Sequence, residues 1–179
     1  MKNIKAMSKI LNESTGKKCL ALLLVLVLVF TTIPVSVEAA AENGWSLYVC
    51  SPLEQVLNLT EPSAVVPGGR GYMVPQQVAV VDANGRSVIG AEVTFEVSTN
   101  DYVTSVMRGI NKRTITVYTN ENGIASAAST DPQYLGEGFQ VYSKWANLTQ
   151  GLEVKAKATE VATTVVFKVK VNTYGRSPN

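Results

Sequence analysis

The sequence predicts an all-β fold, a β-sandwich or barrel, preceded by a cleavable signal peptide. After about forty residues, helical periodicity is almost absent, and apolar residues alternate with polar ones at a period of two. These runs are separated by Gly, Pro, Asn and Asp at intervals of roughly ten residues. Many short strands with closely spaced turns favour a sandwich or barrel over an α/β fold.

Residues 1–41 have the three parts of a secretory signal peptide. Lysines come first, an apolar run over 19–30 follows, and small residues surround Ala39 and Ala41. We expect cleavage after one of these two alanines. An uncleaved membrane anchor is the alternative, but the apolar run has only 12 residues. A membrane-spanning helix needs about 20.

Loss of residues 1–41 changes the charge of the chain. The whole chain has 16 Lys and Arg and 14 Asp and Glu, a net charge of +2. The leader holds five of the basic and two of the acidic residues, so the remaining 138 residues have 11 and 12, a net charge of −1. This length suits one domain. The charge gives no support for nucleic acid or membrane as a partner of a secreted product.

Only Cys50 remains after cleavage, so an intramolecular disulfide is impossible and stability depends on core burial. We expect Cys50 to pack as a small hydrophobic residue in the first strand. An intermolecular disulfide is the alternative. Segment 42–71 is the least regular part of the chain, and we expect it to contain this first strand in an otherwise irregular stretch.

Four later segments carry the strand pattern most plainly, and each has one apolar face. Their polar residues are expected to face solvent. We also expect residues 172–179 to form a disordered tail. The expected buried residues, in chain order, are Val93, Phe95 and Val97; Phe139, Val141 and Ser143; Leu152, Val154, Ala156 and Ala158; and Val165, Phe167, Val169 and Val171.

Two Asn-Gly pairs mark turns, at Asn84-Gly85 and Asn122-Gly123. Because both residue types accept positive φ, we expect type I′ hairpin turns. Residues 116–118 and 124–128 would form the arms of the second hairpin-like unit.

The turns stand within longer signatures. Residues 66–68 are Val-Pro-Gly, residues 82–85 are Asp-Ala-Asn-Gly, and residues 90–95 are Gly-Ala-Glu-Val-Thr-Phe. Residues 119–125 are Thr-Asn-Glu-Asn-Gly-Ile-Ala, and residues 165–167 are Val-Val-Phe. In this order they resemble the bacterial immunoglobulin-like domain of group 1, the module of invasin- and intimin-type surface proteins.

The resemblance covers residues 57–171 and implies an immunoglobulin-like β-sandwich in a cell-surface protein. We therefore expect a secreted or surface-associated, non-enzymatic module for cell adhesion or for binding a protein or glycan. Fold alone does not determine function. A structural spacer and a carbohydrate-binding accessory domain of an exported enzyme system are the alternatives.

Few residues or motifs in the sequence indicate an enzyme. The chain has no histidine, which excludes Ser-His-Asp and Cys-His catalysis and an ordinary zinc site. Residues 68–71, Gly-Gly-Arg-Gly, lack the Lys-Ser/Thr of a phosphate-binding loop. Glu92 and Glu96 belong to the solvent face of a strand, where we expect them to be hydrated. We expect no catalytic, cofactor-binding or metal-binding residue, and no cofactor.

Calcium takes oxygen ligands, and several loop residues are candidates by type. Their spacing matches no EF-hand, and Asp and Asn are expected at turns for backbone reasons. The candidates are Asp82, Asn84, Asp101, Glu121 and Asp131.

Tyr142 and Trp145 are the best candidates for ligand contact. Their odd spacing would place them on opposite sides of a strand. We expect Trp145 to pack in the core, because large aromatic side chains are usually buried. Exposure, with a role in sugar or protein contact, is the alternative.

Overall fold

The computed structural model describes residues 44–175; the predicted signal peptide and residues 176–179 of the predicted tail lie outside the described residues. Every regular element in this range is a β-strand, which confirms the all-β prediction, and no helix there could cross a membrane. The strands are β1 (Ser46–Val49), β2 (Glu54–Asn58), β3 (Arg70–Tyr72), β4 (Gln77–Val81), β5 (Glu92–Val97), β6 (Val103–Val106), β7 (Thr114–Tyr118), β8 (Ile124–Ser126), β9 (Gln140–Ser143), β10 (Thr149–Ala158) and β11 (Thr164–Asn172).

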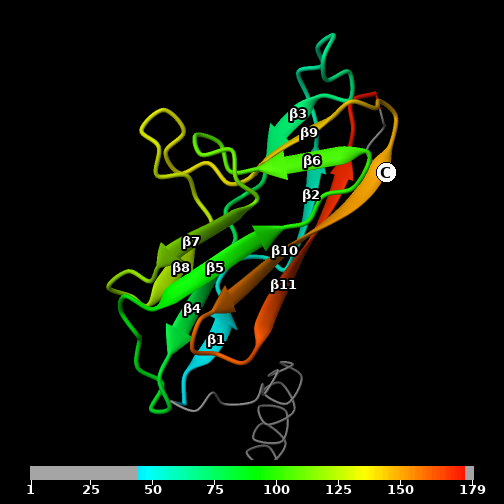
Figure 1. Ribbon diagram of the computed structural model, residues 1–179. Helices are drawn as coiled ribbons and strands as arrows, with labels where there is room; N and C mark the ends of the chain where they lie inside the picture. The colour runs from blue at the N-terminus through cyan, green and yellow to red at the C-terminus, as the bar shows by residue number, and fades with distance from the viewer. Residues whose placement is uncertain (1–43, 176–179) are drawn as a thin grey trace, which may run out of the picture. The chain divides into compact units, whose positions relative to one another are not determined.

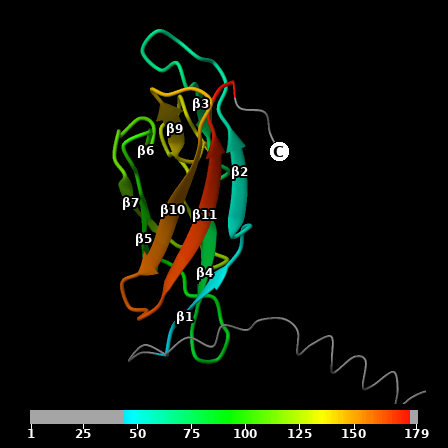
Figure 2. The same cartoon turned by 90° about the vertical axis from the view of Figure 1, so that its right-hand side faces the viewer.

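The strands form three sheets arranged as a sandwich. The largest has the order β2-β11-β10-β5-β7, and the two smaller ones have the orders β1-β4-β8 and β3-β9-β6. The β1-β4-β8 sheet packs over one end of the five-stranded sheet and the β3-β9-β6 sheet over the other (Figures 1 and 2). Paired strands are antiparallel, except that β2 runs parallel to β11.

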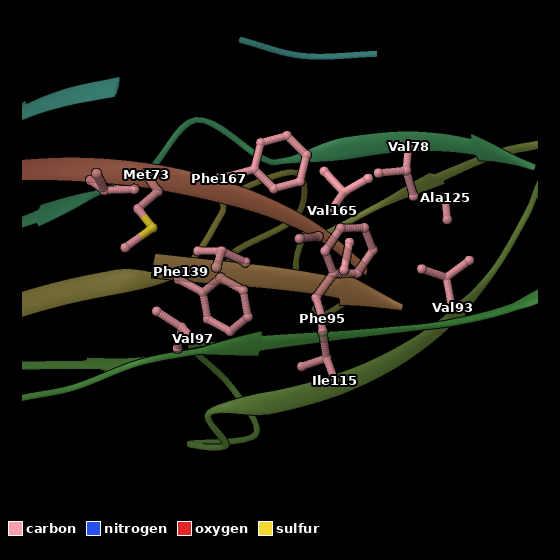
Figure 3. Close-up of a cluster of buried hydrophobic side chains, with 14 of the residues drawn as sticks. Met73, Val78, Val93, Phe95, Val97, Ile115, Ala125, Phe139, Val165 and Phe167 are labelled. Atoms are coloured by element: carbon pink, nitrogen blue, oxygen red, sulfur yellow. The ribbon is translucent and has the colours of Figure 1, made fainter. Parts of the chain in front are cut away.

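The core lies between the five-stranded sheet and the two smaller sheets. Phe95 of β5 and Phe167 of β11 have no exposed surface and point toward Val78 of β4 (Figure 3). Phe139 and Met73 fill the other end of the same core. Alternate side chains are buried from Leu152 to the end of β10 and along most of β11, so one face of the large sheet is covered and the other faces solvent. All the residues predicted to be buried in the four regular segments are buried.

The two Asn-Gly turns have the same structure, and it is not type I′. Gly85 and Gly123 have φ of +76° and +72°, but neither preceding Asn has positive φ. In each turn the glycine N–H donates to the carbonyl oxygen three residues earlier, at 3.0 Å for Gly85 and 2.9 Å for Gly123. This is a type I turn followed by a left-handed glycine. The type I′ prediction is wrong because only the glycine enters the left-handed region.

Both turns are corners at which the chain leaves one sheet for the other. The first closes a short hairpin, because residues 86–88 pair back on β4 through the Val81–Ser87 bridge before the chain crosses to β5. The second lies between β7 and β8, which belong to different sheets. Thr119, which is buried, joins the two corners. Its hydroxyl donates to the carbonyl oxygen of Val88 at 2.6 Å and accepts the N–H of Ala91 at 2.8 Å. The two Asn-Gly corners, linked by Thr119, therefore position the two sheets against each other.

The chain ends of the domain are more regular than predicted. Segment 42–71 contains β1, β2 and the first residues of β3, and β2 pairs with β11 through its backbone. Of the predicted disordered tail, Asn172 ends β11 and Thr173 is buried beside it. The Asn172 amide donates to Asn58 Oδ1 at 2.8 Å, and its Oδ1 accepts the Thr149 hydroxyl at 2.9 Å. These polar contacts order the segment, although its sequence carries no strand pattern.

Candidate functional site: an aromatic end

Three exposed aromatic residues lie in loops at one end of the domain. Tyr102, Trp145 and Tyr174 are 46%, 58% and 49% exposed. Tyr102 precedes β6, Trp145 follows β9, and Tyr174 follows β11. We call these three residues and the loops that carry them the aromatic end. Its loops join the tips of β6, β9 and β11 at the end of the fold where the small β3-β9-β6 sheet lies (Figure 1).

The hydroxyl of Ser143, the last residue of β9, ties two of these loops together. Ser143 Oγ accepts the Trp145 N–H at 3.0 Å and donates to the carbonyl oxygen of Tyr102 at 2.7 Å. Ser143 is buried, so these bonds are shielded from water. The hydroxyl thereby ends the strand and turns the chain outward immediately before Trp145.

Gly68 joins the third loop to the other two. Its carbonyl oxygen accepts the Tyr174 N–H at 2.7 Å. A Cβ on Gly68 would lie 2.2 Å from the carbonyl oxygen of Trp145, so only glycine allows this approach. Leu148 and Thr173 exchange three further hydrogen bonds between the same loops, at 2.8, 2.9 and 3.3 Å. The exposed aromatic rings therefore extend from a backbone that is held in place, which lowers the entropy cost of binding.

The prediction for Trp145 is corrected by this geometry. A strand continued beyond Ser143 would place Trp145 on the buried face, as the alternation over Val141 and Ser143 suggested. The strand stops at Ser143, and the tryptophan is exposed. Tyr142 lies on the outward face of β9, half-buried, opposite Arg70 on one neighbouring strand and Thr104 on the other.

The outward face of the small sheet adds a second group of aromatic side chains. Arg108 donates from Nη1 to the hydroxyl of Tyr72, and its guanidinium lies 3.9 Å from the ring centroid of Tyr134. Gln140 also donates to the Tyr72 hydroxyl, at 3.3 Å. Such a stack stabilises the loop that carries Tyr134. No described carboxylate pairs with Arg108, whereas the neighbouring Arg70 forms an exposed ion pair with Glu61 at 2.7 Å.

Sequence reasoning missed most of these residues. Tyr72, Arg108 and Tyr134 are far apart in the chain and meet only after the small sheet has formed. Tyr102 and Tyr174 each lie just outside a strand. Aromatic residues at strand ends, beyond the period-two pattern, were the available signal.

Two of the five calcium candidates, Asp82 and Asp131, use a side-chain oxygen to bond the backbone of a turn. Asp82 Oδ1 accepts the N–H groups of Arg86 and Asn84, both at 2.8 Å. These bonds hold the pKa of Asp82 below its usual value, and the bond from Arg86 has the largest effect. Asp131 Oδ1 accepts the Gln133 N–H at 2.9 Å. Asp101 and Glu121 are exposed in other loops. Within residues 44–175 no three acidic, Cys or His side chains gather as a metal site would require.

Two other residues of interest lie on the surface. Cys50 follows β1 and is exposed, so it does not pack in the first strand as expected. Partial burial nevertheless raises the pKa of its thiol. Glu92 accepts the hydroxyl of Thr159 at 2.8 Å, and Glu96 lies opposite Lys155 on the solvent face. Both glutamates have the hydrated positions that the strand pattern predicted.

Comparison with known proteins finds matches among solved structures. No protein-family model matches the chain, and no curated protein does so either. Sixteen chains among the solved structures match. One of them is the crystal structure of the S-layer protein SbsC domains 4 and 5, which is 11% identical with a TM-score of 0.37. The match covers 71% of this chain and 51% of that one, about half of its length. A likeness this remote does not indicate a shared function.

Proposed function

We propose that the chain is an exported, non-enzymatic recognition module of immunoglobulin-like fold, which binds a protein or glycan at the cell surface through its aromatic end. The observation that carries the proposal is the exposure of Trp145 on a backbone fixed by Ser143 and Gly68. Tryptophan and tyrosine are the residues that most often dominate binding surfaces. An exposed ring also supplies the flat apolar face that sugars and proteins contact.

The strand order supports the immunoglobulin-like part of the proposal. An immunoglobulin domain has strands A, B and E in one sheet and C, F and G in the other, with C′ added beside C in the variable type. Here β1, β4 and β8 take the places of A, B and E, and β5, β10 and β11 those of C, F and G. β7 lies beside β5, in the place of C′. The β3-β9-β6 sheet is an addition to this plan, and it borders the aromatic end.

The proposed membership in group 1 of the bacterial immunoglobulin-like domains rests on the turn signatures at residues 82–85 and 119–125. Both form the same corner, and the two corners contact each other. Export rests on the leader over residues 1–41.

The proposal is tested by pull-down of the exported chain on the producer's own cell walls, on a glycan panel and on host matrix proteins. We expect saturable binding that Trp145→Ala weakens tenfold or more, as at a binding hot spot. Tyr118→Ala is the matched control, because Tyr118 is 64% exposed but lies on β7, outside the aromatic end. Binding that survives Trp145→Ala would place the ligand elsewhere. Absence of binding to every target would favour the spacer function.

A further inference from the structure

Gly151 is the third residue of β10, at a position where neither packing nor backbone geometry calls for glycine. It pairs with Lys170 of β11, and β5 pairs with β10 only from Val154 onward. The φ of Gly151 is not positive, and a Cβ built on it would have no atom within 4 Å. Glycine within a strand lowers stability. A strand glycine often marks a bulge, a tight bend, or the close approach of a ligand or of another backbone.

Gly151 lies in the floor of a hollow of about 600 Å³ on the solvent face of the five-stranded sheet. That is within the range of about 300–1,000 Å³ for small-molecule sites. Thr149, Glu153, Lys168 and Lys170 surround it, and Ser98 closes one side. The solvent face of the sheet is turned toward the viewer in Figure 2, where β10 and β11 lie in front.

The two lysines beside the hollow differ in the residues that lie opposite them on the neighbouring strands. Lys168 has Glu153 opposite it on β10 and Glu54 opposite it on β2. Lys170 has Gly151 and Val56 in the same positions, so no carboxylate is its cross-strand neighbour. Val56 is 64% exposed and borders Lys170 with an apolar surface. The hollow thus offers an ammonium group with no carboxylate directly opposite it, and hydroxyl groups beside an open backbone floor at Gly151.

We propose that this hollow binds an acidic sugar unit, bearing a carboxylate or a phosphate, of a glycan that also contacts the aromatic end. Asn100 joins the two places: its Oδ1 accepts the Tyr102 N–H at 2.9 Å and its amide nitrogen lies 3.5 Å from the carbonyl oxygen of Gly151. The anionic group pairs with Lys170, and the sugar ring lies over Gly151. This inference deepens the proposed recognition function and rests on it.

The test titrates the exported chain with polygalacturonate, with its uncharged methyl ester and with a glycerol-phosphate polymer. We expect at least one acidic polymer to bind, and the ester to bind tenfold or more weakly. The polymer that binds shows whether carboxylate or phosphate is the source. Gly151→Thr should weaken binding tenfold or more while leaving the urea-unfolding midpoint unchanged or raised, since threonine favours strands.

A charge-matched pair locates the contact. Lys170→Gln should weaken binding, and Lys157→Gln should not, because Lys157 is on the same face of β10 but outside the hollow. Unchanged binding in Gly151→Thr and Lys170→Gln, or equal binding of the methyl ester, would overturn the inference. If Trp145→Ala still abolished binding in that case, the proposed function would stand without this subsite. Absence of binding by all three polymers would overturn the inference, and the cell-wall and matrix pull-downs would then decide the proposed function separately.

Discussion

Alanine substitution of the two corner glycines should have unequal effects, although both turns have the same hydrogen bonds. Gly85 and Gly123 have φ of +76° and +72°, so alanine at either site is forced into the left-handed region. That costs about 1–2 kcal/mol. At Gly85 a Cβ meets nothing within 4 Å. At Gly123 it would lie 2.9 Å from Ser87 Cβ and 3.0 Å from the carbonyl oxygen of Val80. Overpacking of this kind adds about 1–3 kcal/mol.

We therefore expect Gly85→Ala to lower the free energy of unfolding by about 1–2 kcal/mol and Gly123→Ala by about 2–5 kcal/mol. Urea melts of both variants beside the wild type measure the difference. Asparagine tolerates the left-handed region, so Gly85→Asn should recover most of its loss, whereas Gly123→Asn should remain destabilised by the clash with Val80 and Ser87. Equal losses in the two alanine variants would refute the claim that the corners pack against each other at Gly123.

Two further predictions concern the core and the first corner. Phe95→Ala should lower the free energy of unfolding by about 3–5 kcal/mol, because its ring is fully buried between the sheets; a loss in urea melts below about 1 kcal/mol would mean that the ring does not fill that space. Asp82 has a lowered pKa in the folded state, so its contribution is fully present above the ordinary carboxyl pKa of about 3.9 and is lost as the pH falls through the lower folded value. Asp82→Asn keeps the accepting oxygen, as Asn120 does in the second corner, and should remove this part of the acid dependence of stability; an unchanged acid dependence would assign it to other groups.

The parts of the fold that could be predicted are those in which side chains decide the structure. β5, β10 and β11 belong to a sheet with one face against the core and one in water, so their apolar residues alternate with polar ones. Every second residue is apolar and buried in Val93 to Val97 and in Leu152 to Ala158, so the sequence itself distinguishes the covered face from the wet one. The fold class follows from it, because several such strands in one chain require a second layer to cover them.

The segments that could not be predicted are held mainly by backbone and polar contacts. β2 has no apolar alternation, and it forms because its backbone pairs with β11. The amide of Gln55 also exchanges two hydrogen bonds with the backbone of Val74, at 3.1 and 3.2 Å. A partner more than a hundred residues away, such as Asn172 for Asn58, leaves no periodic trace near either residue. The same reason explains why residues 42–71 looked irregular.

The exposure of Trp145 shows how a single polar side chain can reverse an inference from periodicity. Phe139, Val141 and Ser143 are all buried, and the next residue in phase is Trp145. Hydrophobicity alone would continue the strand and bury the ring. The Ser143 hydroxyl instead bonds the backbone of Trp145 and of Tyr102, which ends β9 and directs the ring into solvent. An apolar residue at position 143 would leave both backbone groups without this partner. Ser143 therefore puts a polar side chain in a buried position at the end of β9. Its hydrogen bonds support the exposed aromatic surface on which the proposed recognition function depends.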